Sequence, residues 1–138
     1  MLQSSLTIKT QGRGLYAIDN RIRACVSEVG LQQGLCQVFL QHTSASLILC
    51  ENADSSVQQD LENFMARLVP DKDTLYRHTA EGADDMPAHI RSVLTANSLT
   101  VPIIKGDLGL GTWQGIYLWE HRYRPHERYV IVTIMGIH

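Results

Sequence analysis

Histidines that lie close to carboxylates in the sequence are the residues of this chain best suited to bind a metal or to catalyse a reaction. His78 and His89 bracket residues 81–87, a short segment that contains the adjacent carboxylates Asp84 and Asp85. Imidazole and carboxylate groups together are a common ligand set for a divalent metal. The same pairing also suits general acid–base catalysis, in which the carboxylate tunes the imidazole. The spacing matches no established metal motif, so metal binding, acid–base catalysis and an ordinary hydrogen-bonded role all stay open.

A third histidine, His42, follows the apolar run 36–40 and begins the sequence His-Thr-Ser-Ala-Ser. A side chain at a strand end can point into a cleft, so His42 is a further candidate ligand. The hydroxyl residues after it, Thr43, Ser44 and Ser46, could donate hydrogen bonds to an anion. A serine beside His42 also raises a hydrolase hypothesis, although the Gly-x-Ser-x-Gly elbow is absent. The other histidines, in a turn and at the carboxyl terminus, are interpreted as solvated: His121, His126 and His138.

The glycine-rich segment 105–115 is the third feature that could contact a ligand. Its glycines allow tight turns and a close backbone approach, and Lys105 before them could pair with a phosphate. The segment is neither a Walker loop nor a dinucleotide-binding fingerprint, because the required lysine and helix do not follow. Glu120, at the end of the next predicted strand, is a candidate site carboxylate. Arg128, one of three nearby arginines, has the side chain that binds phosphate in a fork. The alternative for the glycine-rich segment is a plain hairpin connection, and the alternative for the arginines is a solvated turn.

Length and charge limit the classes of protein to which the chain can belong. Its 138 residues predict a single domain over 1–138, large enough to build a core without metals or disulfides. Twelve basic and 14 acidic residues give a net charge of -2, so no nucleic-acid or membrane-surface partner is expected. No apolar run is long enough to span a bilayer. Three cysteines without a close pair, and no signal-peptide pattern, predict reduced core cysteines in a cytoplasmic protein.

Hydrophobic periodicity predicts an α+β fold. Strands are expected over 2–10, 35–41, 99–104, 113–120 and 128–135. Helices are expected over 19–29, over 55–68 and from Pro87 onward, with Asp19 and Asp85 as caps for the first and third. The last two strands would face each other across the polar turn 122–127. We therefore predict a mainly antiparallel sheet covered by helices on one face.

Three blocks of the sequence, in order, resemble the YjbQ-like family over nearly the whole chain. The first is His-Thr-Ser-Ala-Ser-Leu from His42, followed by Glu51 and Asn52. The second runs from His78 through residues 81–90, and the third is the Gly-Thr-Trp-Gln segment within 109–115. The resemblance implies an α+β fold that assembles as a homotrimer with clefts at subunit boundaries. It also implies metal binding through histidines at the positions of His42, His78 and His89.

The activity that the resemblance implies is a weak or secondary thiamine-phosphate synthase reaction. In that reaction a pyrimidine pyrophosphate couples to a thiazole phosphate, and pyrophosphate leaves. Our hypothesis is therefore a small enzyme whose divalent ion, zinc by preference, is held by the three histidines and keeps one position open. Nitrogen ligands would also suit iron, nickel or copper. Asp84 and Asp85 would orient the imidazoles and take part in catalysis with Glu120, while Lys105 and Arg128 would attract phosphate.

Two alternatives use the same residues differently. The first is a trimeric binding module that holds a phosphorylated metabolite without turnover. The second is the hydrolase, in which Ser44 or Ser46 would be activated by His42. Turnover separates an enzyme from a binding module, and sensitivity to a serine-directed acylating reagent rather than to chelation would identify the hydrolase.

Overall fold

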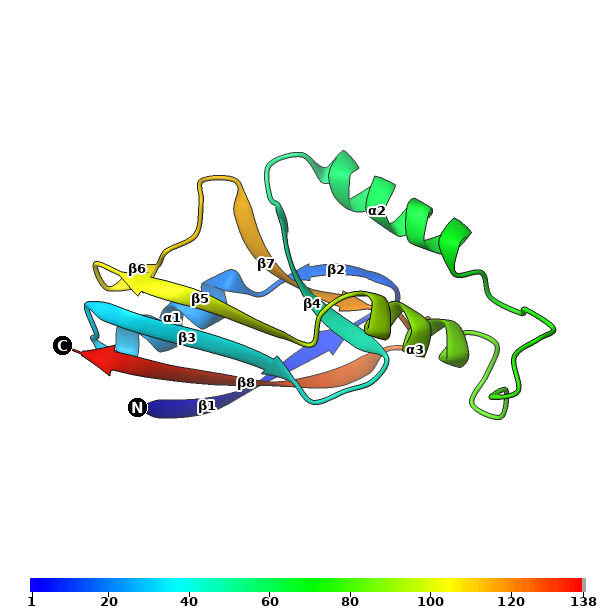
Figure 1. The fold of residues 1–138 in the computed structure, drawn as a ribbon, viewed down its shortest axis with the longest axis horizontal. Helices are drawn as coiled ribbons and strands as arrows, with labels where there is room; N and C mark the ends of the chain where they lie inside the picture. Colours follow the sequence, from blue (N-terminus) through cyan, green and yellow to red (C-terminus); the bar gives the residue numbers. More distant parts are fainter. Residues whose placement is uncertain (138) are drawn as a thin grey trace.

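Two antiparallel sheets and three helices make up residues 1–137, the part of the chain that the computed structural model describes (Figure 1). His138 lies outside the described residues. The elements are, in chain order, β1 (Leu2–Thr10), β2 (Gly14–Ala17), α1 (Asp19–Val29), β3 (Gln33–Leu40), β4 (Ala45–Glu51), α2 (Ser55–Leu68), α3 (Asp85–Leu94), β5 (Ser98–Ile104), β6 (Asp107–Leu108), β7 (Gln114–Glu120) and β8 (His126–Ile137).

The strands form two sheets where the sequence predicts one. The five-stranded sheet has the order β1-β8-β3-β5-β6, and the three-stranded sheet has the order β2-β7-β4. The predicted strands and helices are all present, and the α+β class is confirmed. The predicted pairing of the last two strands is wrong, because β7 pairs with β2 and β4 whereas β8 pairs with β1 and β3. Residues 121–125 therefore cross from one sheet to the other.

Three strands, β2, β4 and β6, were not predicted. β2 and β6 have four and two residues, too few for periodicity to register. β4 shows no alternation because most of its residues are buried, and the same holds for its neighbour β7. In β7, Ile116 and Leu118 belong to the main core, while Trp119 packs on the opposite face against Met65 of α2. A strand that is covered on both faces is largely apolar and does not alternate.

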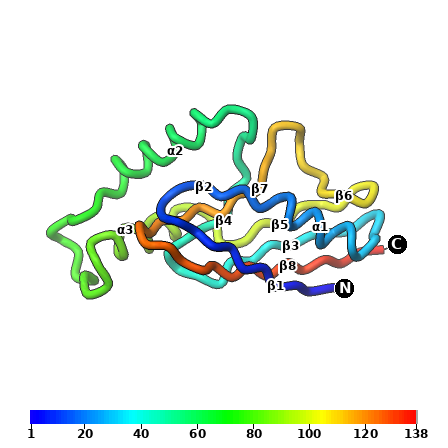
Figure 2. Tube along the Cα trace, turned by 180° about the vertical axis from the view of Figure 1, so that it is seen from behind, coloured from blue at the N-terminus to red at the C-terminus, as the bar shows by residue number. Residues whose placement is uncertain are grey.

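The main core lies between the sheets and includes α1. Ile22 and Val26 of α1 pack in one cluster with Val38 of β3 and Leu118 of β7. In Figure 2, α1 lies on the near side of the five-stranded sheet. Helices α2 and α3 instead cover the outer face of the three-stranded sheet, where Met65, Val69, Ile90 and Trp119 share a second cluster. The expectation of a single sheet with all helices on one face is corrected accordingly.

The helix ends differ from the predicted caps in ways that matter for the site. Asp54 caps α2, accepting a hydrogen bond from the Ser56 backbone N–H at 2.9 Å. Asp19 and Asp85 are the first helical residues of α1 and α3 rather than caps. Asp84 occupies the cap position of α3 but makes no side-chain cap bond there. The Asp84 and Asp85 carboxylates are thus directed to partners elsewhere in the molecule.

The three cysteines lie where the sequence predicts them. Cys25, Cys36 and Cys50 are all free and buried, as expected for core residues. Burial, with a smaller effect of Cys25, raises the pKa of the Cys36 thiol to about 11, which makes it a poor nucleophile. As for the helices, none of those described combines the length and the apolar character that a membrane-crossing helix requires.

The close approach of β3 and β8 gives a test of the fold. Gly34 and Gly136 are directly opposite, and a Cβ on Gly34 would lie 2.2 Å from the Met135 carbonyl oxygen. Because backbone cannot give way easily, we expect Gly34→Ala to lower the free energy of unfolding by about 1–3 kcal/mol in urea denaturation. Gly111→Ala is the control, since its added Cβ would meet only the flexible Gln114 side chain, at 3.3 Å. Equal effects of the two substitutions would contradict the steric explanation.

Candidate metal centre

Two histidines and one aspartate converge where α3 begins. Asp85 is the first residue of α3 and His89 lies four residues later, so both side chains share one face of the helix. His78 comes from the segment before the helix. The His78 Nε2 atom lies 2.7 Å from Asp85 Oδ2, and His89 Nε2 lies 3.1 Å from the same oxygen. The three potential ligand atoms all lie within 4.8 Å of one another.

The hydrogen bond at the far side of His89 determines which nitrogen it offers to the cluster. His89 Nδ1 lies 2.9 Å from the Thr43 carbonyl oxygen, which can only accept, so Nδ1 carries a proton. In the neutral ring Nε2 would then hold the lone pair for a metal, whereas a protonated Nε2 would donate to Asp85 Oδ2, 3.1 Å away. A carbonyl that fixes the tautomer in this way is typical of a metal-binding histidine. Two imidazole nitrogens and a carboxylate oxygen suit zinc, and also non-haem iron.

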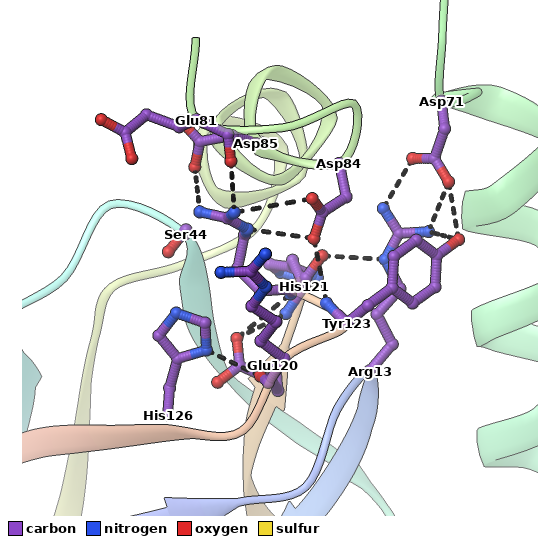
Figure 3. Close-up of polar contacts among 12 residues, drawn as sticks. Arg13, Ser44, Asp71, Glu81, Asp84, Asp85, Glu120, His121, Tyr123 and His126 are labelled. Atoms are coloured by element: carbon purple, nitrogen blue, oxygen red, sulfur yellow. Dashed lines mark hydrogen bonds and ion pairs between the residues drawn. The ribbon is translucent and has the colours of Figure 1, made fainter. Parts of the chain in front are cut away.

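Arg122 and Asp84 hold the Asp85 carboxylate in place. Arg122 donates to Asp85 Oδ1 at 2.5 Å, to Asp84 Oδ2 at 3.0 Å and to the Glu81 carbonyl at 2.8 Å. The Tyr123 N–H also donates to Asp84, at 3.0 Å (Figure 3). Since Arg122 occupies one oxygen of Asp85, the other oxygen is directed at the histidines. Asp84 therefore positions Arg122 rather than contacting the cluster.

The same contacts control the charge on the two carboxylates. Burial favours the neutral form of Asp85, but the hydrogen bond from His78 and the charges of His89 and Arg122 outweigh it, so the pKa of Asp85 lies below its usual value. Burial also favours the neutral form of Asp84, but the hydrogen bonds from the Tyr123 N–H and Arg122 outweigh it, so the pKa of Asp84 is lowered too. Both carboxylates are consequently ionised at neutral pH. An ionised Asp85 is the form that would bind a cation.

His42 lies nearby but outside the cluster. Its Nε2 atom accepts a hydrogen bond from the Tyr129 backbone N–H at 2.9 Å, and its ring stacks on Tyr129 with centroids 5.4 Å apart. Burial, followed by the charge of Arg128, lowers the pKa of His42 and keeps it neutral. With Nε2 engaged by the Tyr129 N–H and Nδ1 3.4 Å from the Arg128 guanidinium, His42 offers no free nitrogen to the cluster. The geometry puts Asp85 in the position that the sequence gives to His42.

A cavity of about 650 Å³, here called the first cavity, adjoins this cluster. His89, a member of the cluster, lines it, and so does His42. The remaining lining is made of hydroxyl, amide and small apolar groups from the end of α3 and the start of β5. The lining residues are His42, Thr43, His89, Ser92, Val93, Thr95, Ala96, Asn97 and Ser98.

Of the three predicted anion-binding hydroxyl residues, only Thr43 reaches this cavity. The Ser44 hydroxyl accepts from Arg128 at 2.9 Å and is buried. Ser46 is fully buried, and its hydroxyl lies 2.8 Å from Nε2 of His121, not of His42. Neither serine can contact a ligand in this arrangement. The Ser–His42 pair that the hydrolase hypothesis requires is not formed.

His121 is the clearest departure from the sequence interpretation, because it is fully buried rather than solvated. Burial, with the charges of Arg91 and Arg13, lowers its pKa to about 3, so the ring stays neutral. Its Nδ1 atom has no hydrogen-bond partner among the described residues. A catalytic serine–histidine pair needs an acid at that nitrogen. The Ser46–His121 contact is therefore structural.

Glu120 and Arg128 form a buried ion pair. Arg128 donates to both oxygens of Glu120, and Thr10 donates to Oε1 at 2.6 Å. Both side chains are almost completely excluded from solvent. Burial alone would raise the pKa of Glu120, but the bonds from Arg128 and Thr10 lower it. The structure thus engages Glu120 and Arg128, predicted as a catalytic acid and a phosphate-binding group, with each other.

Lys105 lies at the opposite end of β5 from the first cavity. β5 begins at Ser98, which lines the cavity, and ends at Ile104, about 20 Å away at roughly 3.3 Å per residue. Lys105 instead borders a small hollow with Gln32 and Gln33. The fold does not bring it to the histidines of its own chain. The sequence analysis did not single out Arg122, although the paired carboxylates Asp84 and Asp85 signal the need for a nearby cation.

Comparison with known proteins places the chain in a family. Residues 4–137 match the family described as UPF0047 protein YjbQ-like. The chain belongs to this family. The protein sll1880 of Synechocystis, of the same UPF0047 group, is 57% identical over 97% of this chain and 91% of its own length. The UPF0047 protein YjbQ of Escherichia coli O157:H7 is 44% identical over 97% of each chain.

Solved structures of similar proteins support the fold of this YjbQ-like chain. The conserved hypothetical protein TT1486 of Thermus thermophilus superposes with a TM-score of 0.87 at 35% identity, covering 96% of this chain and 99% of its own. A YjbQ/UPF0047 protein of Clostridium acetobutylicum gives 0.84 at 35% identity, covering 98% and 100%. The family assignment from the three sequence blocks is thus confirmed, together with the α+β architecture.

The buried pair of Glu120 and Arg128 allows a structural role to be tested against a ligand-binding one. Arg128→Met leaves Glu120 buried without its partner, so we expect urea denaturation to show a loss of about 3–5 kcal/mol. The double variant with Glu120→Gln should lose clearly less, because no buried charge remains. If Arg128→Met left stability intact and weakened phosphate binding instead, the original phosphate-binding assignment would be right.

Proposed function

We propose that this YjbQ-like protein is a metal-dependent enzyme acting on a small phosphorylated molecule. The carrying observation is the convergence of His78, Asp85 and His89 beside the first cavity. Asp85 is ionised, and the Thr43 carbonyl leaves Nε2 as the ligand atom of a neutral His89; a divalent cation would displace the protons through which the imidazoles otherwise bond Asp85. Zinc is the preferred ion for two imidazoles and a carboxylate with an open position.

The lining of the first cavity supports a role for an ion in binding phosphate. No lysine or arginine lines it, and its described polar groups are hydroxyls, an amide and two imidazoles. A bound divalent cation would supply the positive charge that a phosphate or pyrophosphate needs when it binds or leaves. Thr43 and Asn97 are placed to hydrogen-bond a neutral part of the ligand. Arg122, through Asp85, would keep the ligand set rigid.

The reaction proposed is the coupling of a pyrimidine pyrophosphate to a thiazole phosphate with release of pyrophosphate. It is the secondary thiamine-phosphate synthase activity that the family resemblance implies. A non-catalytic module that binds a phosphorylated metabolite would use the same cavity. Formation of thiamine phosphate from the two precursors, measured by fluorescence after oxidation to the thiochrome, separates the two. Saturable binding without product would favour the module.

Metal content distinguishes the cluster seen in the fold from the ligand set inferred from sequence. We expect about one ion per chain in protein purified without tag or chelator, and less than about a tenth of that in His89→Ala and Asp85→Asn. His42→Ala should keep its metal, because His42 Nε2 is engaged by the Tyr129 backbone. Elemental analysis of the purified variants measures this directly.

His126→Ala is the matched control, since the one hydrogen bond of this ring to a described residue goes to the Arg124 carbonyl, at 2.7 Å, and the ring is not part of the cluster. Loss of metal in His42→Ala with retention in Asp85→Asn would return the assignment to three histidines. Absence of metal from the wild type after incubation with zinc would refute the metal centre.

We further propose that the outer face of the five-stranded sheet mediates self-association as a homotrimer, the assembly that the family resemblance implies. No described helix covers this face, and four large apolar side chains on it are 41–53% exposed: Leu35, Phe39, Ile104 and Met135. A shallow hollow of about 130 Å³ lies among them, bounded by Leu35, Gln37 and Met135. Apolar patches of this kind in a small domain typically mark an interface.

Charge insertion on that face tests the association. Wild-type protein should have three times the monomer mass in size-exclusion chromatography with light scattering. Leu35→Lys should shift it toward monomer, because a desolvated charge would face the partner copy. Leu75→Lys, at an 85% exposed loop position away from the sheet, should leave the mass unchanged. A monomeric wild type would exclude the trimer.

A further inference from the structure

A second cavity, of about 410 Å³, borders the same cluster on the side of His78. His78 lines the second cavity and His89 lines the first, while no residue lines both. The two rings are 5.3 Å apart between centroids, and the Asp85 carboxylate joins them. The cluster is therefore accessible from two cavities. The second cavity is lined by Lys72, Asp73, Thr74, Tyr76, His78, Thr79, Gly82 and Ala83.

The chemistry of the second cavity differs from that of the first. Lys72 is the one lysine or arginine among the described residues that line either cavity. No carboxylate of the described residues lies within ion-pair distance of it. Its backbone is held in the left-handed region, with φ of 61°, a conformation that non-glycine residues adopt at a cost of about 1 kcal/mol or more.

The neighbouring polar groups are compatible with an anion. Thr74 and Thr79 contribute hydroxyl groups that can donate to a phosphate oxygen. Asp73, the one acid in the lining, accepts from the Leu75 backbone N–H at 2.9 Å, so one of its oxygens is turned to its own loop. Tyr76 donates its hydroxyl proton to the Pro70 carbonyl at 3.2 Å. The donors available to a ligand are thus Lys72, the two threonines and the exposed His78.

We propose that the second cavity binds the phosphate or diphosphate group of a ligand, with Lys72 as its cationic anchor and the cluster as the wall shared with the first cavity. This assignment rests on the proposed function, in which both reactants are phosphorylated: it locates the diphosphate-bearing reactant on one side of the cluster and leaves the first cavity for the monophosphate. A phosphoryl oxygen near His78 would lie next to the ligand atoms of the cluster. The anion would then be neutralised from two sides.

Pyrophosphate binding to the full-length protein tests the assignment. Isothermal titration calorimetry with inorganic pyrophosphate is performed on zinc-loaded and on metal-free protein, and metal content is measured before and after each titration. Lys72→Met should weaken binding at least about tenfold, the effect of losing one charge-assisted contact. Lys105→Met is the matched control, because Lys105 is also a loop lysine with positive φ, 51°, and lies at the other end of β5. It should bind like the wild type.

A second pair of variants places a carboxylate in each cavity in turn. Thr79→Glu should abolish pyrophosphate binding by repulsion, whereas Val93→Glu, at an 84% exposed helical position of the first cavity, should leave it within about threefold. Both positions are exposed, so neither change should impair folding. The reverse result would put the anion in the first cavity and overturn the assignment.

The outcomes separate this inference from the metal proposal. Lys72-dependent binding in protein that takes up no metal would support the second cavity while refuting the metal centre. Metal uptake that depends on His89, with pyrophosphate binding equal in wild type and Lys72→Met, would overturn the second cavity alone. Absence of pyrophosphate binding by wild-type protein in both states would also overturn it.

Discussion

The contact between Arg122 and the carboxylates of Asp84 and Asp85 is the interaction on which the candidate site depends. Arg122 lies in the crossing between the two sheets, and the aspartates lie where α3 begins, 37 residues or more earlier in the chain. By occupying Asp85 Oδ1, the guanidinium directs Oδ2 toward the two histidines. A carboxylate left to itself at a helix start would cap the helix or face solvent. The ion pairs with Arg122 instead fix the Asp84 and Asp85 carboxylates in one orientation.

The buried charges around this contact explain why the residues after β7 are so constrained. Glu120 pairs with Arg128, and His121 stays neutral beside Ser46. A buried charge is costly without its partner, so the strand ends of both sheets are held in the arrangement that pairs Glu120 with Arg128. The rigid frame includes the connection between β3 and β4, whose Thr43 carbonyl sets the orientation of His89. The polar residues at this end of the molecule therefore divide into a buried supporting set and an accessible cluster.

This division determines which side chains can contact a ligand. The sequence offered serines, an acid and an arginine as reactive groups, but the fold buries Ser46, Glu120 and Arg128. The accessible groups are the histidine–aspartate cluster and the linings of two cavities that meet at it. An ion at the cluster would be the natural meeting point for two reactants. The membership of the YjbQ-like family fits this view without fixing the substrate.

The sequence by itself determined the family, the α+β class and the helix over 55–68, because local periodicity and short motifs encode them. It also singled out His78 and His89, which the fold brings together with Asp85. It could not determine the division into two sheets, since most residues of β4 and β7 are buried and neither strand shows alternation. It also could not decide which of His42 and Asp85 joins the cluster. That choice depends on a backbone N–H from Tyr129 and a guanidinium from Arg122, which lie 87 and 37 residues away in the chain from the groups they bind. Only the tertiary structure brings such partners together, and their hydrogen bonds decide which side chains remain available to a ligand.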